Sequence, residues 1–242
     1  MSARLVKAAA TALVVTLLTG AVLTGAQLIG VAPAQAAAPA ADTDYSSFFT
    51  DDALRGSGWR ACPSPVTWSV DTGRLSAAAA KREVTRLHKA LAHWSRHSGV
   101  PLEFTGRQRL VYDNSSYLLR SADDRAAEER HIYIGFYGAK EVPGLSGNVV
   151  GLARPTFVLT NEREVVGGMA VFRRGYVLRE QSAEPRHLVH LYLHELGHIF
   201  GLGHATSTAN VMYPTLGTMT SLGPGDRAGV RAHTQACTVP TG

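Results

Sequence analysis

The chain has 242 residues, of which 45% are hydrophobic and 18% are charged, and its formal net charge is +5. This length and apolar content predict one globular domain, or at most two small ones, and argue against a disordered chain. The basic residues are scattered, with no aromatic platform among them, so we expect no nucleic-acid partner.

The N-terminal segment has the pattern of a secretory signal peptide. Arg4 and Lys7 precede an apolar run over residues 8–31, and the small-residue stretch Ala34-Gln35-Ala36 follows that run. We therefore expect residues 1–36 to be cleaved off and the protein to be secreted, without stable membrane association. The alternative is an uncleaved signal anchor, because the apolar run is long enough to span a bilayer.

The next segment, residues 37–58, is rich in Ala, Asp, Ser and Gly and shows no sustained period, which predicts a linker or a short pro-segment. The folded domain is then residues 59–242. Alternation of apolar and polar residues predicts a strand over Val66–Val70. A helix is expected from Ser76, which can cap its start, to about His97, because Gly99 follows.

Apolar stretches between this helix and residue 178 predict a sheet, with strands over 102–105, 110–112, 131–137, 149–153 and 169–178. Gly167-Gly168 indicates a turn before the last of these. From Pro185 the apolar residues recur around most of a helical circumference, which predicts an internal helix. A short C-terminal helix is expected near Pro224–His233. The predicted fold class is α+β, with a twisted mixed sheet of about five strands, a backing helix, an active-site helix and a small irregular C-terminal part.

The internal helix carries the string His194-Glu195-Leu196-Gly197-His198. Residues four apart on a helix place their Cβ atoms about 5–6 Å from each other on one face. Two imidazoles at that spacing fit zinc, whose bonds to nitrogen are about 2.0–2.1 Å long. We therefore expect His194 and His198 to share one ion.

A third imidazole comes from His204, six residues after His198. On a continuing helix it would point away from the metal, roughly 9 Å further along the axis. Gly201 can take the left-handed conformation that ends a helix and reverses the chain. The spacing therefore predicts a helix, a break at Gly201 and a return that brings His204 to the ion.

This pattern resembles a known family. The string from His194 to His204 matches the long zinc-binding motif of the metzincin peptidases at every fixed position. Residues 210–214 resemble the Met-turn of that clan, and Met212 lies eight residues after His204, as in matrixins. The chain is more similar to small secreted bacterial matrixin-like enzymes than to larger matrixins. The resemblance implies that Met212 forms a hydrophobic floor beneath the zinc without binding it.

Weaker similarities extend the comparison. Residues 222–229 are similar to the start of the last matrixin helix, where Asp226 would brace the Met-turn; a simple helix N-terminal acid is the other interpretation. Gly151-Leu152-Ala153 resembles the edge strand that pairs with substrate. No cysteine-switch segment and no upstream structural zinc set is found, and calcium dependence cannot be carried over. Pro214 occupies the position of the zinc-binding tyrosine of astacin-like relatives, so Tyr213 receives no such role.

Three histidine ligands leave one position of a tetrahedral zinc ion for water, as in catalytic sites. Glu195 follows His194 directly and is expected to act as the general base on that water. The predicted function is therefore a zinc-dependent endopeptidase, acting as a monomer on protein or peptide substrates. Two alternatives stay open, namely a non-catalytic zinc protein with a fourth protein ligand and a metal-dependent amidase acting on non-protein amides.

Other polar residues receive minor roles. His187 and His190 lie on the same helix without a following glutamate and are interpreted as ordinary polar residues behind the site. Cys62 and Cys237, near the two ends of the domain, predict one structural disulfide in an exported protein. The alternative is that Cys62 binds the zinc in a latent form. Specificity is expected to depend on residues 215–222, whose shape the sequence does not reveal.

Overall fold

The computed structural model describes residues 42–50, 57–62, 64–123, 130–158 and 164–236. The elements are, in chain order, β1 (Trp59–Ala61), β2 (Val66–Asp71), α1 (Ala77–Ser98), β3 (Leu102–Arg107), β4 (Leu110–Asp113), β5 (Leu118–Ser121), β6 (His131–Tyr137), β7 (Gly151–Val158), β8 (Glu164–Arg173), α2 (Arg174–Ala183), α3 (Pro185–Ile199), α4 (Pro224–Ala232) and β9 (Thr234–Ala236). Within these ranges, no helix combines the length and apolarity that a membrane crossing needs. The expected signal peptide, residues 1–36, lies outside them.

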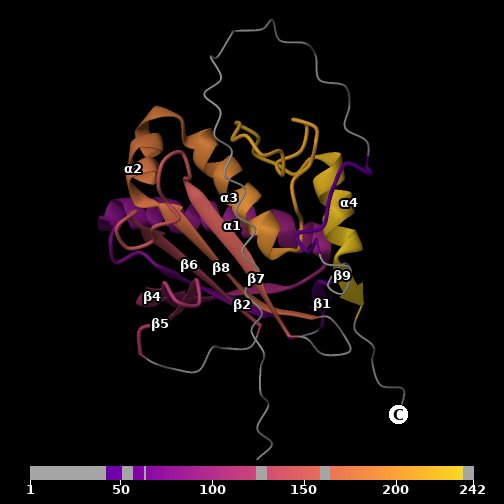
Figure 1. Cartoon of the computed structure of the whole chain (residues 1–242), viewed down its shortest axis with the longest axis horizontal. Helices are drawn as coiled ribbons and strands as arrows, with labels where there is room; N and C mark the ends of the chain where they lie inside the picture. The colour runs from indigo at the N-terminus through magenta and orange to yellow at the C-terminus, as the bar shows by residue number, and fades with distance from the viewer. Residues whose placement is uncertain (1–41, 51–56, 63, 124–129, 159–163, 237–242) are drawn as a thin grey trace, which may run out of the picture.

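The main sheet has five strands in the order β3-β2-β6-β8-β7. All its pairings are parallel except the last, in which β7 runs antiparallel to β8. This confirms the predicted α+β fold with a mixed sheet of about five strands. Strand β7 ends the order, and Figure 1 shows it lying beside α3.

Helix α1 begins and ends where local signals predict. The Ser76 hydroxyl accepts a backbone N–H of the first turn, and Gly99 takes a left-handed conformation with φ 74°. Glycine adopts this conformation at little cost, so it ends the helix and frees the chain to turn into β3. Leu87, Leu91 and Trp94 are buried at helical spacing and join the core.

Helix α3 is internal, as predicted. Its apolar residues are buried around most of the circumference, and Pro185 occupies the first turn, where its missing N–H costs nothing. Helix α1 supports α3 from one side, because the Trp94 indole N–H donates to the Leu193 carbonyl at 3.0 Å. The Trp94 ring also stacks on Phe200, with 5.6 Å between the ring centroids. Burial of side chains of this size contributes roughly 1.5–3 kcal/mol each.

The predicted turn at Gly167-Gly168 is wrong. Both glycines lie inside β8, where they pair with His131 and Ile132 of β6. A Cβ atom at position 168 would lie only 2.5 Å from Cγ2 of Ile199, near the end of α3. The glycine therefore serves the close approach of the active-site helix to the sheet, and not a reversal of the chain.

The strand predicted over residues 169–178 is also only half correct. Strand β8 ends at Arg173, and helix α2 begins at Arg174. No side-chain cap marks this start, because Arg173 at the N-cap makes no capping hydrogen bond. The apolar residues Val177 and Leu178 continue the composition of the strand, which explains why the boundary was missed.

Two small pairings were not predicted. Strands β4 and β5 form an antiparallel hairpin, and β1 pairs in parallel with β9. The second pairing joins the two ends of the domain, because Ala61 lies opposite Ala236. Strand β4 matches the strand predicted over residues 110–112, but it lies in this hairpin and not in the main sheet. Strands β1, β5 and β9 are too short to show a sequence pattern.

Candidate metal centre

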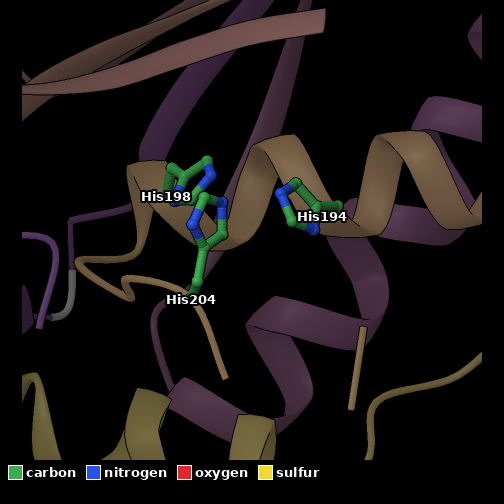
Figure 2. A group of neighbouring side chains, drawn as sticks. All are labelled: His194, His198 and His204. Atoms are coloured by element: carbon green, nitrogen blue, oxygen red, sulfur yellow. The ribbon is translucent and has the colours of Figure 1, made fainter. Parts of the chain in front are cut away.

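His194 and His198 project from one face of α3, as Figure 2 shows. Their ring centroids are 4.9 Å apart, and the planes are perpendicular. This follows from their four-residue spacing, which stacks the two side chains one helical turn apart. The pair can therefore approach one ion from two directions.

The chain reverses after α3 and brings the third imidazole to this pair. Gly201 takes φ 89°, and its N–H donates to the His198 carbonyl at 3.0 Å. The ring of His204 then lies 5.3 Å from that of His194 and 5.1 Å from that of His198, measured between centroids. One ligand atom from each of the three histidines lies within 4.8 Å of the others.

Backbone carbonyls fix the orientation of the two helical imidazoles. Nδ1 of His194 lies 2.7 Å from the Val211 carbonyl, and Nδ1 of His198 lies 2.8 Å from the Leu202 carbonyl. A carbonyl only accepts, so each Nδ1 carries the hydrogen and each Nε2 keeps a free lone pair. This arrangement behind the ligand is typical of metal-binding histidines.

The electrostatics keep these imidazoles neutral. Burial, followed by smaller effects of neighbouring histidines, lowers the pKa of His194 to about 4 and that of His198 to about 3. Burial also lowers the pKa of His204. A neutral imidazole is the form that binds a metal, so protons do not compete for the site near neutral pH.

Glu195 is buried against the first residue of the edge strand. A Cβ atom at position 151 would lie 2.5 Å from Oε1 of Glu195, so the missing side chain of Gly151 makes room for the carboxylate. Burial alone raises the pKa of Glu195 to about 8. A carboxyl group with a raised pKa beside a potential metal site is suited to exchange protons near neutral pH.

Met212 lies under α3 in the core. It is 1% exposed, and a Cβ atom at position 197 would lie 2.3 Å from its sulfur. Gly197 therefore allows the helix to rest directly on the methionine. The turn that contains Met212 also contacts the residue after His204, because the Ala205 N–H donates to the Met212 carbonyl at 2.9 Å.

Asp226 performs both of the roles considered for it. Its fully buried carboxylate accepts the N–H groups of Val211 at 2.7 Å and Met212 at 3.2 Å, which braces the turn. The same carboxylate accepts the Gly223 N–H at 2.7 Å and so caps the start of α4. Burial raises the pKa of Asp226, although these hydrogen bonds partly counteract the rise.

A cleft of about 1030 Å³ runs across the three histidines and Glu195. The first residues of β7, residues 148–150 before them and residues 214–216 all line this cleft. The predicted specificity loop, residues 215–222, therefore begins at the cleft. Part of the wall comes from an unexpected source, because Ser46 and Phe48 also line this space.

This contribution comes from within the expected linker, where residues 44–49 pack against the domain. The ring of Phe48 lies edge-on to that of His198 at 5.7 Å, and Phe49 is buried in the core. Sequence reasoning missed these residues. The available signal was the Phe48-Phe49 pair, which is unusual in an otherwise polar segment.

The other histidines of α3 lie outside the cluster. Nδ1 of His190 accepts the Met219 N–H at 3.1 Å, and Nδ1 of His187 lies 3.0 Å from Oε2 of Glu180. Burial lowers the pKa of His190, so it is neutral and able to accept that hydrogen bond. This contact anchors residue 219, within the segment predicted to determine specificity, to α3.

The predicted disulfide involves Cys237, which lies outside the described residues. The strand pairing of their neighbours agrees with a link, because Ala61 and Ala236 directly precede Cys62 and Cys237 and lie opposite each other. The Cys62–Cys237 disulfide stays a prediction.

The chain matches a known protein family. A family model described as matrixin, of the peptidase family M10, matches residues 58–233. No curated protein matches the chain. The fold and the family match define a metallopeptidase. The chain belongs to the matrixin family, as the motif over residues 194–214 predicted.

Proposed function

We propose that this matrixin is a secreted zinc-dependent endopeptidase, with His194, His198 and His204 as zinc ligands and Glu195 as the general base. The observation that carries the proposal is the convergence of three imidazole ligand atoms within 4.8 Å beside a buried carboxylate, in the wall of a cleft. All four residues line the same cleft, in which a substrate could reach them.

The donor set supports zinc as the metal. All three candidate ligands are imidazole nitrogens, and two of them have the N–H of the other ring nitrogen bonded to a backbone carbonyl. Neutral imidazole suits zinc, and zinc bound by three protein ligands retains a position for water.

When bound, zinc would supply a Lewis acid that polarises the scissile carbonyl and lowers the pKa of a water molecule to about 7. Glu195 accepts the proton of the attacking water and then passes it to the leaving amine. Its burial supports this role, because burial raises the pKa of Glu195 and so favours the protonated form that the carboxyl group takes between the two steps. A cation close by shifts that pKa back toward the charged form, in which Glu195 begins as a base.

The edge of β7 supports an extended peptide as substrate. Gly151, Leu152 and Ala153 line the cleft, and β7 is the end strand of the main sheet. Such an edge offers unpaired N–H and C=O groups to a peptide that adds as a further strand. The main chain of the substrate is then held beside Glu195, whatever its side chains are.

Secretion rests on the leader pattern of residues 1–36 and on the predicted disulfide. The enzyme therefore cleaves its protein or peptide substrates outside the cytoplasm, as a monomer. Mass spectrometry of the protein from the culture medium tests this part, because a chain that retains residues 1–36 would be a membrane-anchored form.

Replacing Glu195 with glutamine tests the mechanism. The expected result is loss of casein and peptide-library cleavage by a factor of about 10² or more, with zinc content unchanged, because the variant keeps the size of the side chain and removes the base. Glu103→Gln is the matched control, since Glu103 is exposed on β3. Cleavage by Glu195→Gln at the rate of the control would end the proposed mechanism, and a zinc-loaded wild-type protein that cleaves no peptide would favour a binding or amidase function.

A further inference from the structure

Residues 44–49, which we call the 44–49 segment, run antiparallel to the chain that follows α3. The Phe48 N–H donates to the Gly201 carbonyl at 2.8 Å, and the Gly203 N–H donates to the Ser46 carbonyl at 2.8 Å. Ser47 and Leu202 form the bridge between these two hydrogen bonds. The segment therefore pairs with the residues that carry the chain from the helix to His204.

Asp44 binds the residues that follow His204. Its carboxylate accepts the N–H of Thr206 at 2.8 Å and the Thr206 hydroxyl at 2.7 Å. It also accepts the Ser207 N–H at 2.9 Å and the side-chain amide of Asn210 at 2.7 Å. One carboxylate thus joins the residues after His204 to the start of the turn that contains Met212. Charge-assisted hydrogen bonds of this kind are stronger than neutral ones.

The backbone of His204 itself is also held. The Ser46 hydroxyl donates to the His204 carbonyl at 2.8 Å. His204 differs in this respect from the helical histidines, whose positions are fixed by the hydrogen bonds of α3. A ligand on an irregular loop depends on such contacts for its geometry.

Three glycines make room for the 44–49 segment. A Cβ atom would lie 2.5 Å from the Ser46 hydroxyl oxygen at Gly203, 2.2 Å from the Asp44 carbonyl oxygen at Gly225, and 2.9 Å from Cβ of Tyr45 at Gly229. None of the three has a positive φ. Their lack of a side chain therefore reflects close packing and not a conformational need. The domain is shaped to hold this segment.

We propose that the 44–49 segment is a permanent wall of the active site and that Asp44 is a positioning residue for His204. The role of His204 as a ligand rests on the function proposed above. The inference has a consequence for maturation. If residues 37–58 are processed, the cut falls before Asp44, so that at most residues 37–43 are removed with the leader.

The mature N-terminus gives a direct test. Intact mass and N-terminal peptide mapping of the active, secreted protein are expected to show a chain that begins at or before Asp44. An active protein that begins after Asp44 would overturn the proposal. This measurement needs no variant and no added metal.

The second test is the zinc affinity of Asp44→Asn, measured by competition with a chromophoric chelator. The variant is expected to bind zinc about 10-fold more weakly than wild type, with kcat reduced more than KM is changed, because loss of support behind a ligand costs metal affinity. Asp42→Asn is the control, since Asp42 is an exposed acid two residues earlier. A purely structural role would lower the melting temperature and leave the zinc affinity of the folded protein unchanged.

Gly225→Ala tests the same contact without changing any charge, because its Cβ atom would lie 2.2 Å from the Asp44 carbonyl oxygen and 2.8 Å from Nδ2 of Asn210, which binds Asp44. It is expected to reproduce the loss of zinc affinity, and Gly175→Ala, whose Cβ meets nothing within 4 Å, is the matched control. Zinc affinities equal to those of the controls would overturn the positioning role, as would a rise in activity, which would indicate an inhibitory segment. Failure of the wild type to bind zinc would instead contradict the proposed function.

Discussion

The carboxylate of Asp226 accepts the backbone N–H of Met212 at 3.2 Å, and the peptide group that this N–H belongs to also binds a histidine. The carbonyl of that peptide, from Val211, accepts the Nδ1 hydrogen of His194 at 2.7 Å. A single peptide plane therefore joins a buried acid to a candidate zinc ligand. Hydrogen bonds in such a chain polarise and strengthen one another.

Asp226→Ala is expected to destabilise the metal-free protein by about 3 kcal/mol, because it leaves the buried N–H groups of Val211, Met212 and Gly223 without their acceptor. Zinc affinity is expected to fall about 10-fold, since the peptide group whose carbonyl orients His194 loses its brace. Urea denaturation and chelator competition measure the two effects. Asp123→Ala, at an exposed position, is the control. A variant as stable as this control would show that the brace is dispensable.

Gly151→Ala is expected to reduce kcat by about 10- to 100-fold. Its Cβ atom would lie 2.5 Å from Oε1 of Glu195, and displacement of a catalytic group by less than 1 Å has effects of this size. Zinc affinity is expected to stay unchanged, because no histidine is touched. Steady-state kinetics with chelator competition separates the two quantities, and Gly175→Ala serves as the control. Unchanged kcat would mean that Glu195 tolerates displacement or is not the base.

The stabilising effect of Asp44 is expected to disappear in acid. Burial would raise the pKa of Asp44, but hydrogen bonds from Thr206, Ser207 and Asn210 outweigh that effect and lower it below 3.8. A lowered pKa stabilises the fold above the unfolded-state value, and this contribution is lost as the pH falls through the folded-state value. The difference in melting temperature between wild type and Asp44→Asn should therefore be constant from about pH 8 to 5 and shrink below about pH 4. A difference that grows in acid would contradict this assignment.

The Cys62–Cys237 link is expected to appear in peptide mapping without reduction. The opposition of Ala61 and Ala236 in the β1–β9 pair brings the chain ends together at this point. Cys62→Ser should destabilise the protein by about 2–4 kcal/mol, because it removes the stabilisation that a disulfide closing a long loop usually provides. Thermal unfolding with and without reductant measures it. Alkylation of both thiols in the unreduced secreted protein would rule the link out.

Local signals predicted much of the fold. Ser76 and Gly99 mark the ends of α1, because caps act within one helical turn. Strand β6 was predicted because a strand buried along its whole length has a nearly continuous apolar sequence. Gly168 shows the limit of such reasoning. A glycine serves turns and close contacts equally well, and only the position of Ile199, 31 residues later in the chain, distinguishes them here.

The candidate site likewise has a part that the sequence predicts and a part that it does not. The spacing of His194, His198 and His204 is local, so the sequence alone predicted their convergence. The contacts of Asp44 span about 160 residues, and a single acid in a polar segment carries no sign of its partner. Such long-range contacts can be identified only in the folded structure, where the sheet and helices bring distant parts of the chain together.

Helix α3 is supported by a residue of α1. Trp94 donates to the Leu193 carbonyl, and its ring meets the surface that Gly197 leaves open, on the side away from the cleft. The depth and tilt of the histidine-bearing helix are thus set by the interior of the protein. Substitutions among residues 215–222 are therefore expected to alter the rim of the cleft while the spacing of the three imidazoles on and after this helix is kept.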